Sequence, residues 1–262
     1  MTGLEDLEGW FRGAGPVLLG YSGGVDSSLL GVVGTRVLGE GFLAVIGRSA
    51  AYPMAQWRTA RGIADAHGIR VVEVDTAELD DPAYRANPTN RCYFCKRELW
   101  DVLRAVASDR GFETVIDGTH ADDLTGHRPG ARAGAERGVR SPLVELGWTK
   151  ATVRAAAERL GIEGWDGPSS PCLASRVRYG LEVTPERLEQ VERAEAMLRR
   201  LGVEGDLRVR HLGPVARIEA VPAMIPLIES QWARIEASLL ALGFAGAECD
   251  PAGYRRGSLL TS

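Results

Sequence analysis

Short apolar runs and amphipathic segments alternate along residues 16–160 of the chain. The runs have the length and apolar content of buried strands; they are Pro16–Tyr21, Phe42–Ile46, Arg70–Asp75 and Thr114–Asp117. The segments between and after them have helical length and start signals. They are a first helix that ends near Leu38, followed by Met54–His67, Arg97–Arg110 and Lys150–Leu160. Strands separated by helices indicate an α/β fold with a mostly parallel, doubly wound sheet.

The pattern changes in the last third of the chain. A loop rich in Gly, Pro and Ser is followed by a capped helix, an alternating hairpin and a final helix; these elements are expected at Gly164–Tyr179, Thr184–Leu201, Leu207–Ala220 and Pro222–Leu242. We therefore expect a main α/β domain over residues 1–180. A smaller α+β domain, for substrate binding or oligomerisation, is expected over 181–262.

The composition of the chain mainly excludes certain classes of protein and of binding partner. The chain has 262 residues, of which 45% are hydrophobic and 25% charged, so disordered, collagenous and coiled-coil proteins are excluded. A net charge of −4 gives no global reason to bind nucleic acid. No apolar run has the length of a membrane helix, and the first residues lack the order of a signal peptide. We expect a cytoplasmic protein without a membrane partner.

The basic residues are strongly biased toward arginine. Of the 31 basic side chains, only Lys96 and Lys150 are lysines. An arginine-rich genome accounts for this bias without any functional role.

A glycine-containing polar turn separates the first predicted strand from the first helix. Its sequence is Ser22-Gly23-Gly24-Val25-Asp26-Ser27. Two glycines allow an anion to approach the backbone, and a helix N-terminus offers amide donors and the positive end of a dipole. No Gly-Lys-Ser/Thr follows, so the turn is not a Walker A loop. The alternative is a generic tight turn in which Ser27 caps the helix.

This turn resembles the SGGxDS loop of the ATP pyrophosphatase, or PP-loop, superfamily. The resemblance implies that the loop holds the β,γ-diphosphate of ATP and that residues 1–180 form a PP-loop domain. It also implies that ATP is split between its α and β phosphates, leaving an adenylated substrate. Asp26 is expected to support Mg²⁺ or the loop itself.

A second polar segment follows the fourth predicted strand, at the sheet edge where open α/β folds bind ligands. It contains Asp117, Gly118, His120 and Asp122. It resembles the G-T-N-x-D-D segment of several superfamily members, which implies the second half of the nucleotide site, with His120 where Asn is usual. A solvated acidic loop is the alternative.

Three of the four cysteines lie in polar motifs. Cys92 and Cys95 are separated by two residues at a helix start, and Cys172 lies in the loop before the smaller domain. A thiolate pair with a remote third thiolate suits an iron–sulfur cluster with one open iron. A structural zinc would need a fourth ligand such as Cys249, and the pair alone could form a redox couple. Cys249 by itself is typical of a small buried hydrophobic residue.

With these motifs together, the chain resembles the LarE family, ATP-dependent sulfur transferases of nickel-pincer nucleotide cofactor synthesis. The similarity covers nearly the whole chain and includes Asn87–Lys96, Asp117–Gly130, Trp165–Gly180, Leu207–Ile218 and Asp250–Leu259. It implies a pyridinium-3,5-biscarboxylic acid mononucleotide substrate, whose ring carboxylates are adenylated and converted into thiocarboxylates. By the same analogy we expect a homo-oligomer.

The resemblance implies one of two sulfur sources. Members with one cysteine at the position of Cys172 surrender that sulfur and are left with dehydroalanine. Members with three cysteines hold a [4Fe-4S] cluster whose open iron carries an extra sulfide. Because Cys92, Cys95 and Cys172 are all present, we expect the cluster version, with Cys172 as a ligand.

Arginines are expected to bind the anionic groups of the ligands. Arg208 and Arg210 alternate along a predicted strand, so they emerge on one face, and they match a family R-x-R segment expected to meet phosphate. A solvated strand face is the alternative. Arg176 is a further candidate for the substrate or AMP, and Glu195 is expected to face the same pocket.

Three other functions compete with this interpretation. A tRNA thiolase of the same superfamily also combines such a loop with cysteines, but the acidic charge and the lack of a recognisable RNA-binding module disfavour it. An ammonia-using relative of NAD synthetase has no use for Cys92 and Cys95. A non-enzymatic adenine-nucleotide sensor would bind ATP without releasing pyrophosphate.

Overall fold

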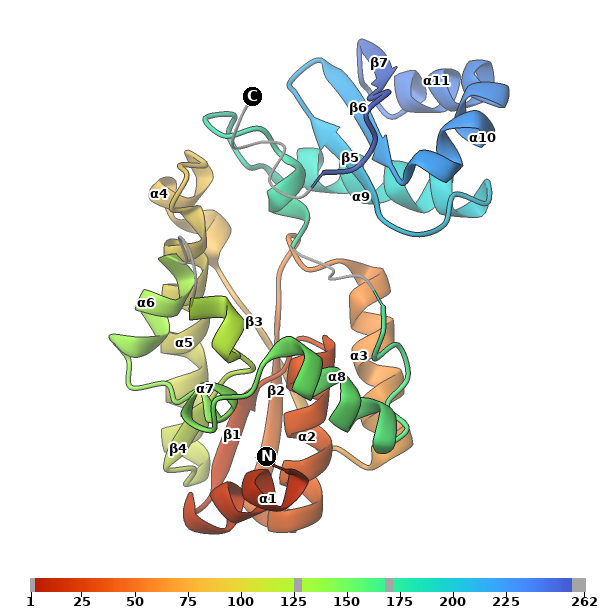
Figure 1. Cartoon of the computed structure of the whole chain (residues 1–262). Coiled ribbons are helices and arrows are strands. Elements are labelled where there is room, and N and C mark those ends of the chain that lie inside the picture. Colours follow the sequence, from red (N-terminus) through yellow and green to blue (C-terminus); the bar gives the residue numbers. More distant parts are fainter. Residues whose placement is uncertain (1–2, 125–128, 168–171, 256–262) are drawn as a thin grey trace. The chain divides into compact units, whose positions relative to one another are not determined.

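The computed structural model describes residues 3–124, 129–167 and 172–255. The chain forms two compact units (Figure 1). Unit 1 comprises Met1–Glu78 and Asn90–Ser170, and unit 2 comprises Leu79–Thr89 and Pro171–Ser262. Among the described residues, no helix has the length and apolar character needed to cross a membrane.

Unit 1 is built on a four-stranded sheet. The strands are β1 (Val17–Gly20), β2 (Phe42–Arg48), β3 (Val71–Asp75) and β4 (Thr114–Ile116), in the order β3-β2-β1-β4. Every pairing in the sheet is parallel. The predicted α/β fold with a parallel sheet is therefore confirmed.

Helices cover both faces of this sheet (Figure 1). They are α1 (Leu4–Gly13), α2 (Val25–Leu38), α3 (Met54–His67), α5 (Arg91–Arg110), α6 (Pro129–Ala135), α7 (Pro142–Glu145) and α8 (Lys150–Arg159), with short 3₁₀ turns η1 (Gly39–Gly41) and η3 (Ala121–Leu124). Val17 and Leu19 of β1 join the core formed with α1, α2, α3 and α8, whereas Leu18 joins the core under α5 and α6. Alternate residues thus enter opposite cores, as the two-residue period of a strand requires.

Unit 2 contains a smaller three-stranded sheet. Its strands are β5 (Leu207–His211), β6 (Val215–Ala220) and β7 (Gly246–Cys249), in that order. The predicted hairpin of β5 and β6 is confirmed, and β7 is added parallel to β6. The remaining elements are α4 (Pro82–Arg85), α9 (Pro185–Arg200), α10 (Ile225–Ser230) and α11 (Trp232–Ala241), with 3₁₀ turns η2 (Glu78–Asp80), η4 (Leu173–Arg176) and η5 (Pro222–Met224).

Asn87 attaches the segment 79–89 to the rest of unit 2. It is fully buried at φ 53°, and its side-chain amide donates to the carbonyl oxygens of Val177, Arg178 and Leu181. Asn is among the few residues other than glycine that tolerate this left-handed backbone. The carbonyl oxygen of Asn87 also accepts from the amide of Gly180. Both its side chain and its backbone therefore hydrogen-bond to the segment 177–181.

Two sequence predictions about elements are corrected, and one N-terminal helix was missed. The single helix over Pro222–Leu242 is wrong, because the segment is divided into η5, α10 and α11. The helix predicted over Arg97–Arg110 begins earlier, at Arg91, so both Cys92 and Cys95 are helical. The amphipathic helix α1 was not predicted, although Leu7 and Phe11 are fully buried by it.

His211 in β5 is a titratable residue buried beside the unit 2 core, so its protonation is linked to the stability of that core. The residue is 4% exposed, with Nε2 2.9 Å from Oε1 of Gln190, Nδ1 accepting from the amide of Gly213, and Phe244 packed beside the ring. Burial, helped by the charge of Arg187, lowers its pKa from 6.5 to about 4. Folded protein therefore holds a neutral imidazole at pH values where the unfolded chain is protonated.

We predict that the contribution of His211 to the free energy of unfolding is full above pH 6.5 and is lost as the pH is lowered toward 4. The unfolded state binds the extra proton in this window, with a slope of at most about 1.4 kcal/mol per pH unit for one group. Urea unfolding as a function of pH measures the slope, and His211→Gln should remove this component. An NMR titration of the ring with a midpoint near 6.5 would contradict the assignment.

Candidate functional site

The turn between β1 and α2 is fixed by a close backbone contact. Gly23 has φ +70°, and a Cβ atom built on it would lie 2.4 Å from Cβ and 2.6 Å from Cα of Ala60 on α3. Real Cβ atoms do not approach other atoms this closely, and φ in this region also disfavours other residues. The turn therefore requires glycine at position 23 for two independent reasons.

The serine side chains line the inside of this turn. Oγ of Ser27 donates to the carbonyl oxygen of Gly24 at 3.0 Å and accepts from the amide of Ser22, and the two serine hydroxyls lie 3.2 Å apart. The N-cap of α2 is Gly24, with no side-chain capping bond, so Ser27 is not the cap. The amides of Val25 and Asp26 precede the first helical hydrogen bond, as at any helix start. This arrangement places the first backbone amides of α2 beside two serine hydroxyls, which suits an anion.

Residues of and before α3 hold the turn from its other side. Tyr52 Oη and Gln56 Nε2 both donate to the carbonyl oxygen of Ser22 at 3.0 Å, and Tyr21 Oη donates to the carbonyl oxygen of Ala60. Burial raises the pKa of Tyr52 and of Tyr21, so both phenols stay neutral donors at physiological pH. None of these contacts was predicted from the sequence, because each partner is distant along the chain.

The segment after β4 packs directly on the start of α2. A Cβ atom on Gly118 would lie 3.0 Å from the amide nitrogen of Ser27 and 3.2 Å from Cβ of Asp26. The two sequence-predicted halves of the nucleotide site are therefore neighbours. The carboxylate of Asp117 accepts from the amide and hydroxyl of Thr119 in its own turn and from Oγ of Ser141 farther along the chain.

Asp122 and His120 lie in the same segment, on and before η3. Oδ2 of Asp122 accepts from the backbone amide of Lys150 at 2.8 Å. His120 is 7% exposed, with Nε2 3.4 Å from a carboxylate oxygen of Asp123. Its Nδ1 has no hydrogen-bond partner within the described part of the chain.

Lys150 is a further residue of this region that sequence reasoning missed. Its ammonium lies 2.8 and 2.7 Å from the two carboxylate oxygens of Asp26. A signal for it was present, because it is one of only two lysines among 31 basic residues. Where almost every cation is arginine, a lysine marks a position at which a compact, flexible charge is used.

Cys92 and Cys95 lie near the start of α5. Cys92 is exposed and Cys95 is partly exposed, and neither is in a disulfide. Gly130, the second residue of α6, lies close by: a Cβ atom on it would be 3.1 Å from Cγ of Lys96 and 3.8 Å from Cβ of Cys92. Residues three apart share one face of a helix, so the two thiols belong to the same face.

Cys172 and Cys249 belong to unit 2. Cys172 is the N-cap of η4, and its carbonyl oxygen accepts from the amide of Ser175 and from Nη1 of Arg176. Cys249 lies on β7 against the unit 2 core, and burial raises the pKa of its thiol. Among the described residues, no three His, Cys, Asp or Glu side chains gather as a metal-binding group. The three-cysteine ligand set therefore stays a prediction.

Two of the predicted arginines in unit 2 form buried ion pairs. Arg176 is 2% exposed and its guanidinium binds both carboxylate oxygens of Glu195, at 2.9 and 3.1 Å. Arg210 binds Oε2 of Glu219 at 2.8 Å, within a pair that is almost fully buried. The alternative of a solvated strand face is excluded for both strand arginines, since Arg208 and Arg210 are 5% and 6% exposed.

Arg208 differs from these two in its surroundings. Its Nη1 donates to the carbonyl oxygen of Leu207, and its guanidinium lies 5.1 Å from the ring centre of Tyr254. Burial lowers its pKa, and the neighbouring charge of Arg176 adds to that effect. The acidic groups of Glu195 and Asp206 act in the opposite direction.

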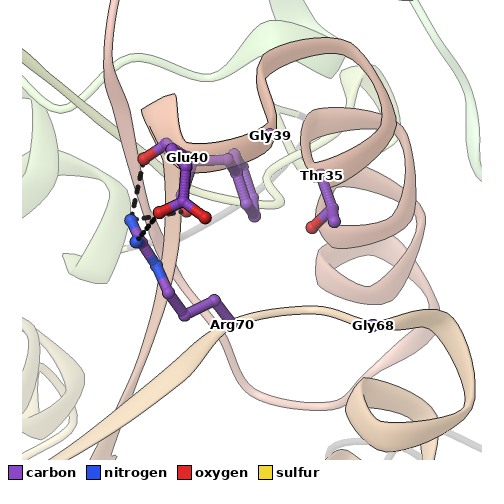
Figure 2. Close-up of a pocket in the computed structure, with 6 residues that line it drawn as sticks. Thr35, Gly39, Glu40, Gly68 and Arg70 are labelled. Atoms are coloured by element: carbon purple, nitrogen blue, oxygen red, sulfur yellow. Dashed lines mark hydrogen bonds and ion pairs between the residues drawn. The ribbon is translucent and has the colours of Figure 1, made fainter.

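A separate cavity of about 290 Å³ lies at the opposite end of unit 1. It is bordered by the C-terminal end of α2 and the start of β2, with the ion pair of Arg70 and Glu40 on its rim (Figure 2). Parallel sheets bind ligands at the carboxyl ends of their strands, and this cavity is at the other edge. We therefore assign it no part in the candidate site.

Known proteins show similarity over the whole chain. The model of the NAD synthase family matches residues 11–92. A protein of Synechocystis sp. described only as uncharacterised is 42% identical over 98% of this chain and 96% of its own. The pyridinium-3,5-bisthiocarboxylic acid mononucleotide synthase of Lactiplantibacillus plantarum is 32% identical over 99% of this chain and 91% of its own. An uncharacterised protein of Methanocaldococcus jannaschii is 30% identical over 78% of this chain and 77% of its own.

We predict that Gly23→Ala weakens ATP binding at least tenfold and lowers the melting temperature. The added methyl group would collide with the backbone of Ala60, which cannot move aside as a side-chain end could. Titration calorimetry and a thermal melt measure the two effects. Gly62→Ala, on the exposed side of α3 with open space around it, is the control: it should keep ATP affinity and gain about 0.5–1 kcal/mol. Unchanged ATP affinity in Gly23→Ala would remove the loop from the nucleotide site.

Proposed function

The chain belongs to the LarE family of ATP-dependent sulfur transferases, and from this premise we propose that it converts pyridinium-3,5-biscarboxylic acid mononucleotide into its thiocarboxylic acid. The observation that carries the proposal is the Ser22–Ser27 turn, with its forced glycine and its cluster of hydroxyl and amide donors at the start of α2. Such a turn supports ATP as the nucleotide. In our proposal the β,γ-diphosphate is bound there, and Asp26 helps to hold the accompanying Mg²⁺.

The proposed reaction activates a carboxylate before sulfur attacks it. A carboxylate is a poor electrophile because its leaving group would be oxide. Its oxygen therefore attacks the α-phosphorus of ATP, the bond from that phosphorus to the β-phosphate oxygen breaks, and pyrophosphate leaves. Sulfide sulfur then attacks the carbonyl carbon of the mixed anhydride, and AMP departs with the electrons of the broken C–O bond. One oxygen of the substrate is thereby replaced by one sulfur.

We propose Cys92, Cys95 and Cys172 as ligands of a [4Fe-4S] cluster. The donor set suits the group, because three thiols are present and the two on α5 are accessible at one helix face. When bound, a cluster with three cysteine ligands leaves one iron open to carry the sulfide that is transferred. The alternative is that Cys172 gives up its own sulfur and is left as dehydroalanine.

Arg208 is the arginine that we propose binds the phosphate of the pyridinium mononucleotide. Arg176 and Arg210 form buried ion pairs with Glu195 and Glu219, and these pairs hold this part of unit 2 in shape. Arg208 is buried on β5, in the segment that matches the family R-x-R pattern, and a guanidinium suits bidentate binding of a phosphate. A homo-oligomer remains part of the proposal, by analogy with the family.

The central test supplies the reduced protein, without oxygen, with ATP, Mg²⁺ and the pyridinium dicarboxylate. We expect pyrophosphate and AMP in equal amounts and a product mass in which sulfur replaces oxygen. Cys172→Ala should abolish thiolation, whereas Cys249→Ala, the matched loss of a thiol on β7, should retain it. Thiolation by Cys172→Ala at the parent rate would reject both sulfur sources.

The same assay separates the competing functions. ATP binding without pyrophosphate release would indicate a nucleotide sensor. Pyrophosphate release that depends on tRNA would indicate a tRNA thiolase.

The cluster has its own test, which needs no turnover. Protein purified without oxygen should contain about four iron atoms and four acid-labile sulfides per chain. We expect Cys92→Ala to lose most of both and Cys249→Ala to keep them. If no iron binds even after anaerobic reconstitution, Cys172 is the sacrificial donor, and each chain that has reacted should show a mass loss of one H₂S.

A further inference from the structure

Lys150 and Asp26 form a charged contact at the start of two helices. Lys150 is the first residue of α8, after the cap Thr149, and Asp26 lies in the first turn of α2. The ammonium contacts both carboxylate oxygens, at 2.7 and 2.8 Å, although the two residues are 124 positions apart in the chain. Their side chains are 32% and 23% exposed. The contact is therefore accessible to solvent and to ligands, unlike the buried ion pairs of unit 2.

The backbone on both sides of the contact is held in place. The amide of Lys150 donates to Asp122, and Gly118 packs against Cβ of Asp26. The lysine side chain is therefore the movable part, because its four-carbon stem rotates freely while its backbone and its partner are fixed. A compact ammonium on a flexible stem can leave one anion and reach another without any shift of the helices.

The location of Asp26 creates an electrostatic problem for the proposed ATP site. A carboxylate in the phosphate-binding turn repels the phosphates of ATP unless a cation neutralises it. Carboxylate oxygens are also the ligands that Mg²⁺ prefers. An ammonium that contacts both oxygens of Asp26 occupies the place from which a divalent cation would bind them.

We propose that Lys150 is an exchangeable counterion of Asp26, which Mg²⁺ displaces when it arrives with ATP. Before ATP binds, the ammonium neutralises Asp26 and keeps divalent metal from binding there alone. When ATP brings Mg²⁺, the metal takes the carboxylate and the ammonium is released toward the phosphates. The inference rests on the proposed function only in taking the turn as the ATP site; it does not depend on sulfur transfer.

The first test titrates Mn²⁺, as a probe for Mg²⁺, into the protein without ATP and follows free metal by EPR. Lys150→Met should bind Mn²⁺ about tenfold more tightly than the parent, since a competing cation is gone. Adding Asp26→Asn to this variant should cancel the gain. Arg159→Met is the control, because it removes one positive charge from the exposed far end of the same helix. Parent-like Mn²⁺ affinity in Lys150→Met would overturn the proposal.

The second test uses the unmodified protein, so it does not depend on how the variant folds. Because the chain has only two lysines, labelling lysine side chains with ¹³C and ¹⁵N gives two signals, with Lys96 as the internal reference. The Lys150 signal should shift when a non-hydrolysable ATP analogue is added with Mg²⁺, and should stay in place with the same Mg²⁺ alone. A signal that does not move although the analogue and metal bind would show that the ammonium stays on Asp26, against the proposal.

These results are separable from the fate of the proposed function. A protein that passes both tests yet never forms a thiocarboxylate would keep the counterion exchange and lose the sulfur transfer. A protein that thiolates its substrate but fails the two tests would keep the sulfur transfer and lose the counterion exchange.

Discussion

The parallel pairing of β1 with β2 on one side and with β4 on the other is the constraint on which unit 1 depends. Parallel neighbours cannot be joined by tight hairpins, so each strand must be followed by a crossover that covers a sheet face. Every strand therefore ends at the same edge. This places Gly23, Tyr52 and Gly118 together, although they follow three different strands. The candidate nucleotide site therefore depends first on the common direction of the strands and only then on individual side chains.

The ion pairs discussed for the two units differ in how deeply they are buried. In unit 2, Arg176–Glu195 and Arg210–Glu219 are buried, and removing one partner of such a pair leaves an uncompensated charge that typically costs about 3–5 kcal/mol. In unit 1, the Lys150–Asp26 contact is partly exposed and costs little to open. A lost activity after substitution of Arg210 therefore reports first on folding. The equivalent loss at Lys150 reports on the site itself.

Local features of the sequence were sufficient for the turn and for most elements of the parallel sheet. The Ser22–Ser27 turn is recognisable because glycines, strand and helix are contiguous, and β1 to β4 follow from short apolar runs. The Lys150–Asp26 contact could not be found in this way, since no periodicity links positions 124 residues apart. The strand β7 was also missed, because Gly246–Cys249 is short and only partly buried. The division of the final helix into α10 and α11 was also missed. Apolar periodicity continues through Gln231, although the backbone leaves the helical conformation there.

The discontinuous make-up of unit 2 also dictates an order of events during synthesis. The segment that contains α4 and Asn87 leaves the ribosome first, but the carbonyl groups that its buried amide binds begin at Val177, 90 residues later. At about 5–20 residues per second, that delay is on the order of 5–20 seconds. During this interval β4 and the rest of unit 1 are synthesised, while the carbonyl groups that the Asn87 side chain binds in the folded protein do not yet exist. Translation therefore completes the two units in a fixed sequence, and unit 2 cannot be obtained as one uninterrupted piece of the chain.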